Sequence, residues 1–149
     1  QLVVYVLVDL RRRKLGVREL VRRLEAAVVE WVGSSGVTAY GKPAAPGVYV
    51  SRDGVEAKIA ALGLKVRNGC TYHGIAVNVA MDLSPFADIA PCGYPGLAVT
   101  QLRGLGVATT VERAGARIPH DDPADHGTAV GMAVFGHGRG QARLIARLT

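Results

Sequence analysis

The sequence predicts an α+β domain with a mixed, largely antiparallel sheet packed with helices. Three observations lead to this prediction. The first quarter of the chain holds one strongly amphipathic helical stretch, several short β-type runs follow it, and Asp53-Gly54 and Asn68-Gly69 separate some of those runs. Both dipeptides are typical of tight hairpin turns. A helix followed by hairpins favours an α+β arrangement over repeated βαβ units.

The N-terminal ten residues, QLVVYVLVDL, are almost continuously apolar and rich in β-branched side chains. This pattern predicts a strand that is buried on both faces. Four cations follow at residues 11–14, and they predict either a solvated connection or a patch that binds a partner. Because the chain opens with Gln1 inside this predicted strand, we expect it to be a fragment of a longer natural protein.

A single amphipathic helix is predicted from Val17 onward. Its apolar side chains recur at steps of three and four residues, at Val17, Leu20, Val21, Leu24, Ala27, Val28 and Trp31. This spacing places them on one helix face, with Trp31 as an anchor of the core. Residues 33–36, Gly-Ser-Ser-Gly, tolerate turn geometry and are expected to end the helix.

The middle of the chain predicts strands. Its runs of apolar and β-branched residues lie at 37–40, 47–51, 55–61, 64–67 and 72–79. We expect a short helical turn at 82–86 and a loop at 90–97, where glycine and proline punctuate the sequence.

The last part of the chain is more polar, most clearly at residues 120–126. The sequence therefore predicts one folded domain over residues 1–113, followed by a polar linker and tail over 114–149. A chain of 149 residues with 49% hydrophobic content is long enough for one sizeable core. His120, His126 and His137 lie in this tail, without the helix or strand scaffold that a metal site needs.

Composition limits the classes of protein that fit. No run approaches the roughly 18 apolar residues of a membrane helix, and the N-terminus lacks a secretory layout, so we expect a cytoplasmic protein with no membrane partner. The two cysteines, Cys70 and Cys92, have no metal-binding CxxC spacing and build no disulfide framework. The net charge of +6 favours an acidic partner without choosing among acidic proteins, membranes and nucleic acids.

Cys92 is the strongest candidate for chemistry. It lies in the turn-like segment Pro91-Cys92-Gly93, where the next residue has no side chain to hinder approach. A lone cysteine is more often a small buried hydrophobe, so this thiol needs a neighbouring positive charge to act as a nucleophile. Lys58, inside an otherwise apolar run, either supplies that charge or points outward into solvent. His73 can serve as a base, a substrate-orienting donor or a satisfied core imidazole.

The chain resembles the lipoate-protein octanoyltransferase family over residues 1–105. Four segments carry the resemblance in the same order: RRRKLGVRELVRRLE, PGVYV, AKIAALGLKVRNGCTYHGIAVNVAMDLSPF and PCGYPGL. Members of that family move an octanoyl group from acyl carrier protein to a lysine of a lipoyl domain through a cysteine thioester. The resemblance implies the fold of the biotin and lipoate protein ligase catalytic domains.

The resemblance also assigns roles to residues of this chain. Cys92 corresponds to the nucleophile, and Lys58 corresponds to the lysine that lowers the pKa of the nucleophile. Lys58 is a candidate base for the acceptor amine as well. The expected acyl-binding residues are His73 and two triplets, Ala61-Leu62-Gly63 and Gly74-Ile75-Ala76.

Partners follow from the same resemblance. The implied donor is octanoyl-acyl carrier protein, and the implied acceptors are lipoyl domains of 2-oxoacid dehydrogenase complexes and the glycine cleavage H protein. We expect a monomer that needs no metal or organic cofactor and binds no nucleic acid. An acidic carrier accounts for the positive charge, and we expect its docking face to include some of Arg11, Arg12, Arg13, Arg22 and Arg23.

The sequence departs from the family at its start. Family members carry an Arg-Gly-Gly…Thr…His-Gly-Pro-Gly-Gln segment before the first strand, of which only the last residue is matched, by Gln1. The activity of this chain by itself therefore stays open at the sequence level.

Two other functions fit parts of the sequence. An ATP-dependent lipoate or biotin protein ligase shares the fold, but it needs phosphate-binding features and no cysteine nucleophile. A non-catalytic module that binds acyl carrier protein or nucleic acid is suggested by the positive charge alone, and aromatic residues for base stacking are few among the cations.

Overall fold

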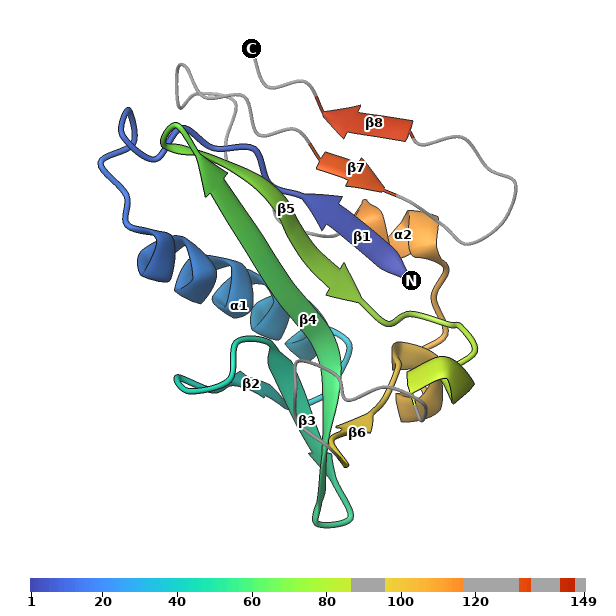
Figure 1. Cartoon of the computed structure of the whole chain (residues 1–149). Helices are drawn as coiled ribbons and strands as arrows, with labels where there is room; N and C mark the ends of the chain where they lie inside the picture. The colour runs from blue at the N-terminus through green and yellow to red at the C-terminus, as the bar shows by residue number, and fades with distance from the viewer. Residues whose placement is uncertain (87–95, 117–131, 135–142, 147–149) are drawn as a thin grey trace.

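The computed structural model describes residues 1–86 and 96–116, together with the backbone of 132–134 and 143–146. Figure 1 shows one main sheet, crossed on one side by a long helix. The elements follow in the order β1 (Leu2–Tyr5), α1 (Val17–Gly33), β2 (Ala39–Gly41), β3 (Val48–Arg52), β4 (Val55–Arg67), β5 (Cys70–Val77), η1 (Ser84–Phe86), β6 (Ala98–Val99), η3 (Leu102–Leu105), α2 (Val111–Gly115), β7 (Met132–Val134) and β8 (Arg143–Ala146).

The main sheet is mixed and largely antiparallel, as predicted. Its strands lie in the order β1-β5-β4-β3-β2 with antiparallel pairing throughout. The short strand β6 adds a parallel pair with β4, through Ala57↔Ala98 and Lys58↔Val99. The strand β4 therefore pairs with three strands, β3, β5 and β6, and is the central strand of the sheet.

Both predicted hairpin turns are confirmed. Asp53 and Gly54 connect β3 to β4, and Asn68 and Gly69 connect β4 to β5. All four residues have positive φ, at 53°, 78°, 53° and 84° respectively. Positive φ at both central positions is the signature of a type I′ turn, whose twist matches that of the flanking strands. The two predicted runs at 55–61 and 64–67 are joined into the single strand β4.

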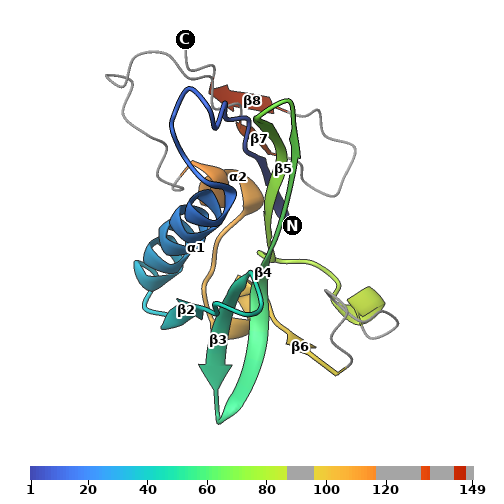
Figure 2. The same ribbon diagram turned by 60° about the vertical axis from the view of Figure 1, so that its left-hand side comes forward.

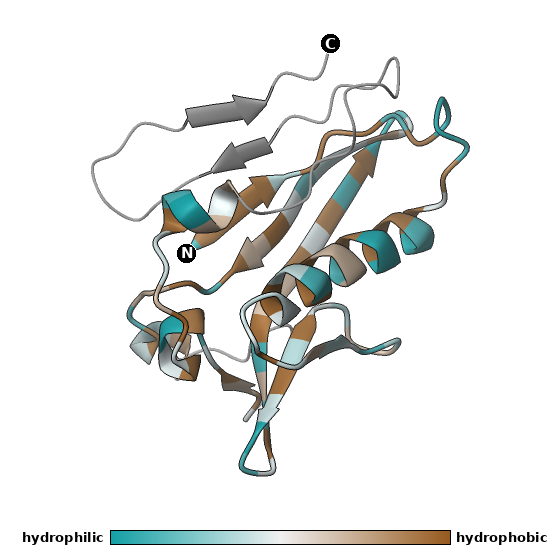
Figure 3. Ribbon diagram, turned by 180° about the vertical axis from the view of Figure 1, so that it is seen from behind, coloured by the Kyte–Doolittle hydropathy of each residue, from teal (hydrophilic) through white to brown (hydrophobic). Residues whose placement is uncertain are grey.

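The helix α1 covers one face of the sheet (Figure 2). It buries Leu20, Val28, Trp31 and Val32, which confirms Trp31 as a core residue. Figure 3, viewed from the helix side, shows brown hydrophobic residues on the strands behind α1 and teal hydrophilic residues along the helix. This separation of side chains is what buries the core between one amphipathic helix and one sheet.

The N-terminal strand differs from its prediction. Leu2, Val4, Val6, Val8 and Leu10 are buried, whereas the alternate positions 3 and 5 are only partly buried and Leu7 is 44% exposed. The strand expected over residues 1–10 covers only Leu2–Tyr5, and the expectation of burial on both faces is wrong. The physical reason is that α1 packs against one side of the sheet only.

Two short strands lie in the segment that was expected to be a polar tail. β7 and β8 pair antiparallel, and β7 lies next to β1 (Figure 1). The sequence missed these strands because each is too short to give a clear alternating pattern. The proposed domain boundary at residue 113 stays a prediction.

Candidate active site

Lys58 is buried within the sheet, with 2% of its surface exposed. Tyr49 of β3 pairs with it on one edge of β4, and Val99 of β6 pairs on the other. The backbone N–H of Thr100 also donates to the Lys58 carbonyl at 3.0 Å. The alternative of an outward, solvated lysine is wrong, because only 2% of the Lys58 surface is exposed.

A register shift in the sheet marks the position of Lys58. Val48 pairs with Ala60, and the next residue, Tyr49, pairs with Lys58. Ile59 is therefore an extra residue on β4, as in a β-bulge. Bulges redirect neighbouring side chains and are common beside functional sites.

The Tyr49 ring and Gly47, both outside β4, lie against the end of the Lys58 side chain. The Lys58 Nζ lies 5.2 Å from the centroid of the Tyr49 ring. Gly47 is so close that a Cβ built on it would lie 2.4 Å from the Lys58 Cε and 3.0 Å from the Nζ. The Gly47 N–H donates to the Glu25 carboxylate of α1 at 2.8 Å.

Asn78 fixes the strand β6 and its continuation beside Lys58. Its backbone N–H donates to the Ile59 carbonyl at 2.9 Å, and its side-chain amide donates to the Thr100 carbonyl at 3.0 Å. Its side-chain oxygen accepts from Gln1 at 3.0 Å, and its backbone carbonyl accepts from Leu102. Asn78 is only 4% exposed, and it joins β4, β5 and the segment after β6 through one buried side chain.

The two triplets assigned to the acyl site are cross-strand partners. Ala61, Leu62 and Gly63 pair with Ala76, Ile75 and Gly74, respectively. Ala61 and Gly63 are exposed, and a Cβ on Gly63 would meet nothing within 4 Å. The middle pair, Leu62 and Ile75, packs with the hydrophobic core instead.

The exposed residues Ala61 and Gly63 lie on a side of the sheet that α1 does not cover. In Figure 2, α1 lies on one side of β4 and β5, and η1 lies on the other. Small side chains at Ala61, Gly63 and Ala76 leave the sheet backbone accessible there, whereas Gly74 lies against the backbone of Val4.

His73 is exposed, so it is not a satisfied core imidazole. Its φ is 69°, a left-handed conformation that is uncommon for residues with a side chain. Its ring lies 6.0 Å from the ring of Tyr5 and 5.0 Å from that of Tyr72. The structure thus places His73 on an exposed aromatic cluster next to Gly74.

Cys70 is a free, exposed thiol at the far end of the sheet. It pairs with Arg67, nine positions along β4 from Lys58, which corresponds to about 30 Å of extended strand. Cys92 lies outside the described residues. Val99, the β6 partner of Lys58, follows Cys92 by seven positions.

The cations near the N-terminus gather at the β4–β5 turn. Asp9 accepts the backbone N–H groups of Arg11 and Arg12 at 3.0 Å each, which shapes the turn at 11–14. The Arg11 side chain lies against Gly69. Lys65 and Arg67 of β4 add two more exposed cations at this end of the sheet.

Two further cations of the predicted docking face lie on α1. Arg22 and Arg23 are exposed, and both pair with Glu19, at 2.6 and 3.0 Å. The hydrogen bond from Arg23, followed by the charge of Arg22, lowers the pKa of Glu19.

A network of polar side chains lies beside Tyr49. Glu56 accepts hydrogen bonds from the Lys42 Nζ and the Tyr40 hydroxyl, each at 2.7 Å. The bond from Lys42, followed by that from Tyr40, lowers the pKa of Glu56, and the same bond raises the pKa of Lys42. The Lys42 Nζ also lies 5.0 Å from the centroid of the Tyr49 ring.

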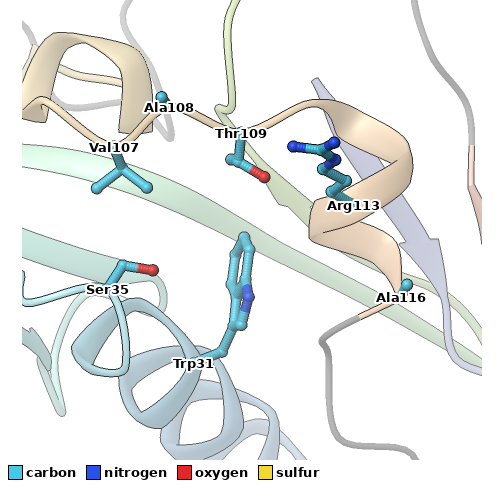
Figure 4. Close-up of a pocket in the computed structure, with 7 residues that line it drawn as sticks. All are labelled: Trp31, Ser35, Val107, Ala108, Thr109, Arg113 and Ala116. Atoms are coloured by element: carbon cyan, nitrogen blue, oxygen red, sulfur yellow. The ribbon is translucent and has the colours of Figure 1, made fainter.

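A separate pocket of about 380 Å³ opens between α1 and α2 (Figure 4). Its walls come from Trp31 and Ser35, the segment 107–109, Arg113 and Ala116. None of the residues assigned to the acyl site lines it.

Gly47, Tyr49 and Asn78 had no predicted role in the site. Gly47 and Tyr49 belong to the PGVYV segment, which was one of the four segments that carry the family resemblance. Asn78 was visible as an amide inside the apolar run at 72–79. Buried amides need hydrogen-bonding partners, so that residue could have been predicted as a structural junction.

Among the described residues, no three side chains of the metal-ligating types lie close enough together to hold an ion. The described helices also include none with the length and apolar character needed to span a bilayer.

Residues 1–119 match the family described as the lipoyl protein ligase A/B catalytic domain. An octanoyltransferase of Thiobacillus denitrificans is 64% identical over 113 residues, which cover 76% of this chain and 50% of that protein. An octanoyltransferase of Chromobacterium violaceum is 56% identical over 121 residues, covering 80% and 56%. One from Pseudomonas fluorescens is 51% identical over 136 residues, covering 88% and 61%. The chain thus spans between half and about three fifths of the length of these curated relatives.

Proposed function

The chain belongs to the lipoyl protein ligase A/B catalytic domain family, and from this premise we propose that it provides the catalytic core of an octanoyltransferase for protein lipoylation. The proposed reaction moves an octanoyl group from acyl carrier protein to a lysine of a lipoyl domain. The relatives named octanoyltransferase, at 51–64% identity, support this choice within the family.

The observation that carries the proposal is the buried Lys58 between β3 and β6. An ammonium group in this position is held next to the strand that directly follows the Pro91–Gly96 segment. A fixed positive charge favours a thiolate over a thiol and so increases the fraction of reactive cysteine at neutral pH. Cys92 is the proposed nucleophile. Cys70 of β5 pairs with Arg67, nine positions along β4 from Lys58, and this distance argues against Cys70.

The proposed first half-reaction exchanges one thioester for another. The Cys92 thiolate attacks the octanoyl carbonyl, a new carbon–sulfur bond forms, and the bond to the carrier sulfur breaks. The carrier thiolate leaves and takes a proton from the Lys58 ammonium group, which leaves Lys58 neutral. Because the two thioesters are similar in energy, no ATP and no cofactor are required. A backbone N–H of Gly93 or of a residue near Leu62 is a candidate donor to the oxyanion.

The second half-reaction forms an amide. The amine of the acceptor lysine attacks the Cys92 thioester, a carbon–nitrogen bond forms, and the Cys92 thiolate leaves. Lys58 in its neutral form is the proposed acceptor of the amine proton, which returns it to the ammonium form. A catalytic free thiol suits a reducing compartment, so the cytoplasm is the proposed location.

The proposed acyl-binding face is the side of the sheet away from α1. Ala61, Gly63 and Ala76 offer an apolar surface on adjacent strands, and Gly74, the cross-strand partner of Gly63, is buried. Exposed small side chains let a flexible alkyl chain approach the strand backbone, and its burial there is favourable in proportion to the apolar area covered. His73 borders this face and is proposed to contact the substrate.

The proposed partners follow from charge. An acidic acyl carrier protein fits the cations at 11–14 and the neighbouring Lys65 and Arg67. Lipoyl domains of 2-oxoacid dehydrogenase complexes and the glycine cleavage H protein are the proposed acceptors.

The test is mass spectrometry of the protein after incubation with octanoyl-acyl carrier protein in the absence of ATP. We expect an octanoyl adduct on Cys92 that hydroxylamine removes. The Cys92→Ser variant should lose the adduct, whereas Cys70→Ser should retain it. An adduct on Cys70, or an acyl-adenylate that forms only with ATP, would contradict the proposal and favour the ligase chemistry of the same family.

A further inference from the structure

We propose that Tyr49 and Gly47 form a clamp that positions the ammonium group of Lys58, so that Tyr49 is a positioning residue of the site. The functional part of this inference rests on the proposed function. The geometric part does not, because it concerns only where the Lys58 side chain is held.

The Tyr49 ring is the aromatic side of the clamp. The Lys58 Nζ lies 5.2 Å from the ring centroid, within the range in which the electron-rich face of an aromatic ring attracts a cation. Lys58 is 2% exposed and Tyr49 is 1% exposed. This attraction is stronger when both groups are removed from water, because less solvent screens them.

Gly47 is the backbone side of the clamp. A Cβ at this position would lie 2.4 Å from the Lys58 Cε and 2.8 Å from the Ala60 carbonyl oxygen, both closer than real Cβ contacts. Only glycine therefore lets the β2–β3 connection lie directly on the lysine. The φ of Gly47 is 142°, which a residue with a side chain rarely adopts.

Both sides of the clamp are themselves fixed. The Glu25 carboxylate on α1 holds the Gly47 N–H at 2.8 Å. The Tyr49 hydroxyl donates to the Ala45 carbonyl at 3.0 Å, and the ring stacks on Tyr40 at 6.2 Å between centroids. Glu25 of α1 thus holds the β2–β3 connection at Gly47, and the Tyr49 hydroxyl holds it at Ala45. Gly47 and the Tyr49 ring both lie against Lys58.

The distribution of lysines provides a direct experiment. The chain contains four lysines, Lys14, Lys42, Lys58 and Lys65, so protein labelled with ¹³C-lysine gives four sets of side-chain NMR signals. The Tyr49 ring should shift the signals of Lys58 and Lys42 by its ring current, since both ammonium groups lie about 5 Å from its centroid. Lys14 and Lys65 are internal controls, and Lys58→Arg assigns the Lys58 signal.

Replacement of Tyr49 tests the clamp. In Tyr49→Leu we expect the Lys58 and Lys42 signals to move towards free-lysine values, with Lys14 and Lys65 unchanged; Tyr49→Phe should preserve the shifts. Unmoved Lys58 signals in Tyr49→Leu would overturn the inference. If Tyr49→Leu does not fold, the inference is tested in the unmutated protein by nuclear Overhauser effects between the Tyr49 ring protons and the Lys58 ε-protons. The absence of these effects would also overturn the inference.

The functional part of the inference is tested on the same variants. The measured quantity is the rate at which each variant forms the octanoyl adduct, relative to the unmutated protein. We expect Tyr49→Leu to slow the reaction by at least about tenfold and Tyr49→Phe to restore most of it. Displaced Lys58 signals with an unchanged rate would overturn the positioning role. Absence of any adduct in the unmutated protein contradicts the proposed function and leaves the NMR test of the clamp intact.

Discussion

Lys58 and Lys65 lie seven positions apart on the same strand, and their surroundings are opposite. Lys58 is 2% exposed, whereas Lys65 is exposed on the surface. Both residues interrupt apolar runs in the sequence in the same way. The comparison therefore shows that the type of residue and its local pattern do not decide which lysine is buried.

The difference comes from the neighbours of β4. At Lys58 the strand has β3 on one edge and β6 on the other. At Lys65 the described pairing is with Tyr72 of β5 on one edge. The Tyr49 ring of β3 and Gly47 before it lie against the Lys58 side chain, whereas the Lys65 side chain is exposed.

Each end of the sheet also has a buried polar residue that joins segments distant in the chain. Asn78 connects β4, β5 and the segment after β6 near Lys58. At the other end, the Thr71 hydroxyl donates to the Val6 carbonyl at 2.8 Å and accepts from the Val8 N–H at 3.0 Å. Both ends of the sheet are therefore joined by hydrogen bonds of a buried polar side chain. Only the end near Asn78 also has a buried lysine.

The largest effect is expected from exchanging the two lysines for methionine. Lys58→Met should slow both adduct formation and transfer by about 10²- to 10⁴-fold, the range typical of losing a proton-transferring group. Lys65→Met should leave both rates unchanged when the carrier is saturating, because the Lys65 side chain is exposed and lies far along the strand, where it affects only docking. Single-turnover kinetics with octanoyl-acyl carrier protein measure both variants. Equal rates in Lys58→Met and the unmutated protein would remove the functional distinction between the two ends.

A second pair of variants compares the buried polar junctions. Asn78→Leu and Thr71→Val should each lower the free energy of unfolding by about 1–3 kcal/mol, because each leaves buried backbone partners without a hydrogen bond. Only Asn78→Leu should also slow adduct formation, since Asn78 fixes the segment after β6 next to Lys58. Urea titrations and acylation rates give the two readouts. An equal loss of rate in Thr71→Val would indicate a general loss of structure instead.

A third change tests whether the cations at 11–14, near the β4–β5 turn, form the docking surface for acyl carrier protein. Reversing Arg11, Arg12 and Arg13 to glutamate should lower the association rate with acyl carrier protein by about tenfold or more and weaken its dependence on salt. Arg103→Glu, a reversal on η3 away from this cluster, is the control. Surface plasmon resonance at two ionic strengths measures both. Unchanged affinity and salt dependence in the triple variant would show that the carrier docks elsewhere.

The smallest effect concerns Glu56, whose pKa is lowered from its usual value of 4.5 by the bonds from Lys42 and Tyr40. A lowered pKa in the folded state contributes stability that is present above the unfolded value and is lost as the pH falls through the folded value. Glu56→Gln should therefore flatten the decrease in stability below about pH 4.5. Thermal unfolding between about pH 3 and 7 measures this change, and a decrease as steep as that of the unmutated protein would contradict it.

Much of the fold followed from local patterns. The helix from Val17, the two hairpin turns and most strands were predicted because the periodicity of apolar residues and the Asp-Gly and Asn-Gly dipeptides act over a few residues. The apolar run at 1–10 was wrongly predicted to be buried on both faces. Such a run does not show whether helices will cover one face of the sheet or both. The strands β7 and β8 were missed because three or four residues carry too little pattern.

The candidate site was predictable only in part. Motif resemblance selected Lys58 and the two triplets, and their roles in the site stay predictions. The structure shows that Lys58 is buried and that the triplets are cross-strand partners. The role of Cys92 as nucleophile stays a prediction. The division of the triplets, with Ala61 and Gly63 exposed and Leu62 and Ile75 in the core, depends on the pleat of a sheet whose register no short motif specifies.

The sequence by itself determined the elements and their turns, because dihedral preferences and amphipathic spacing are properties of neighbouring residues. The tertiary structure alone decided that Lys58, and not Lys65, is enclosed, and that Gly47, Tyr49 and Asn78 are the residues around it. Those contacts join β4 to the β2–β3 connection, to β3, to Asn78 after β5 and to Thr100 after β6, across gaps of about 10 to 40 residues. They depend on which strand edges meet, and that is set by the packing of the whole domain.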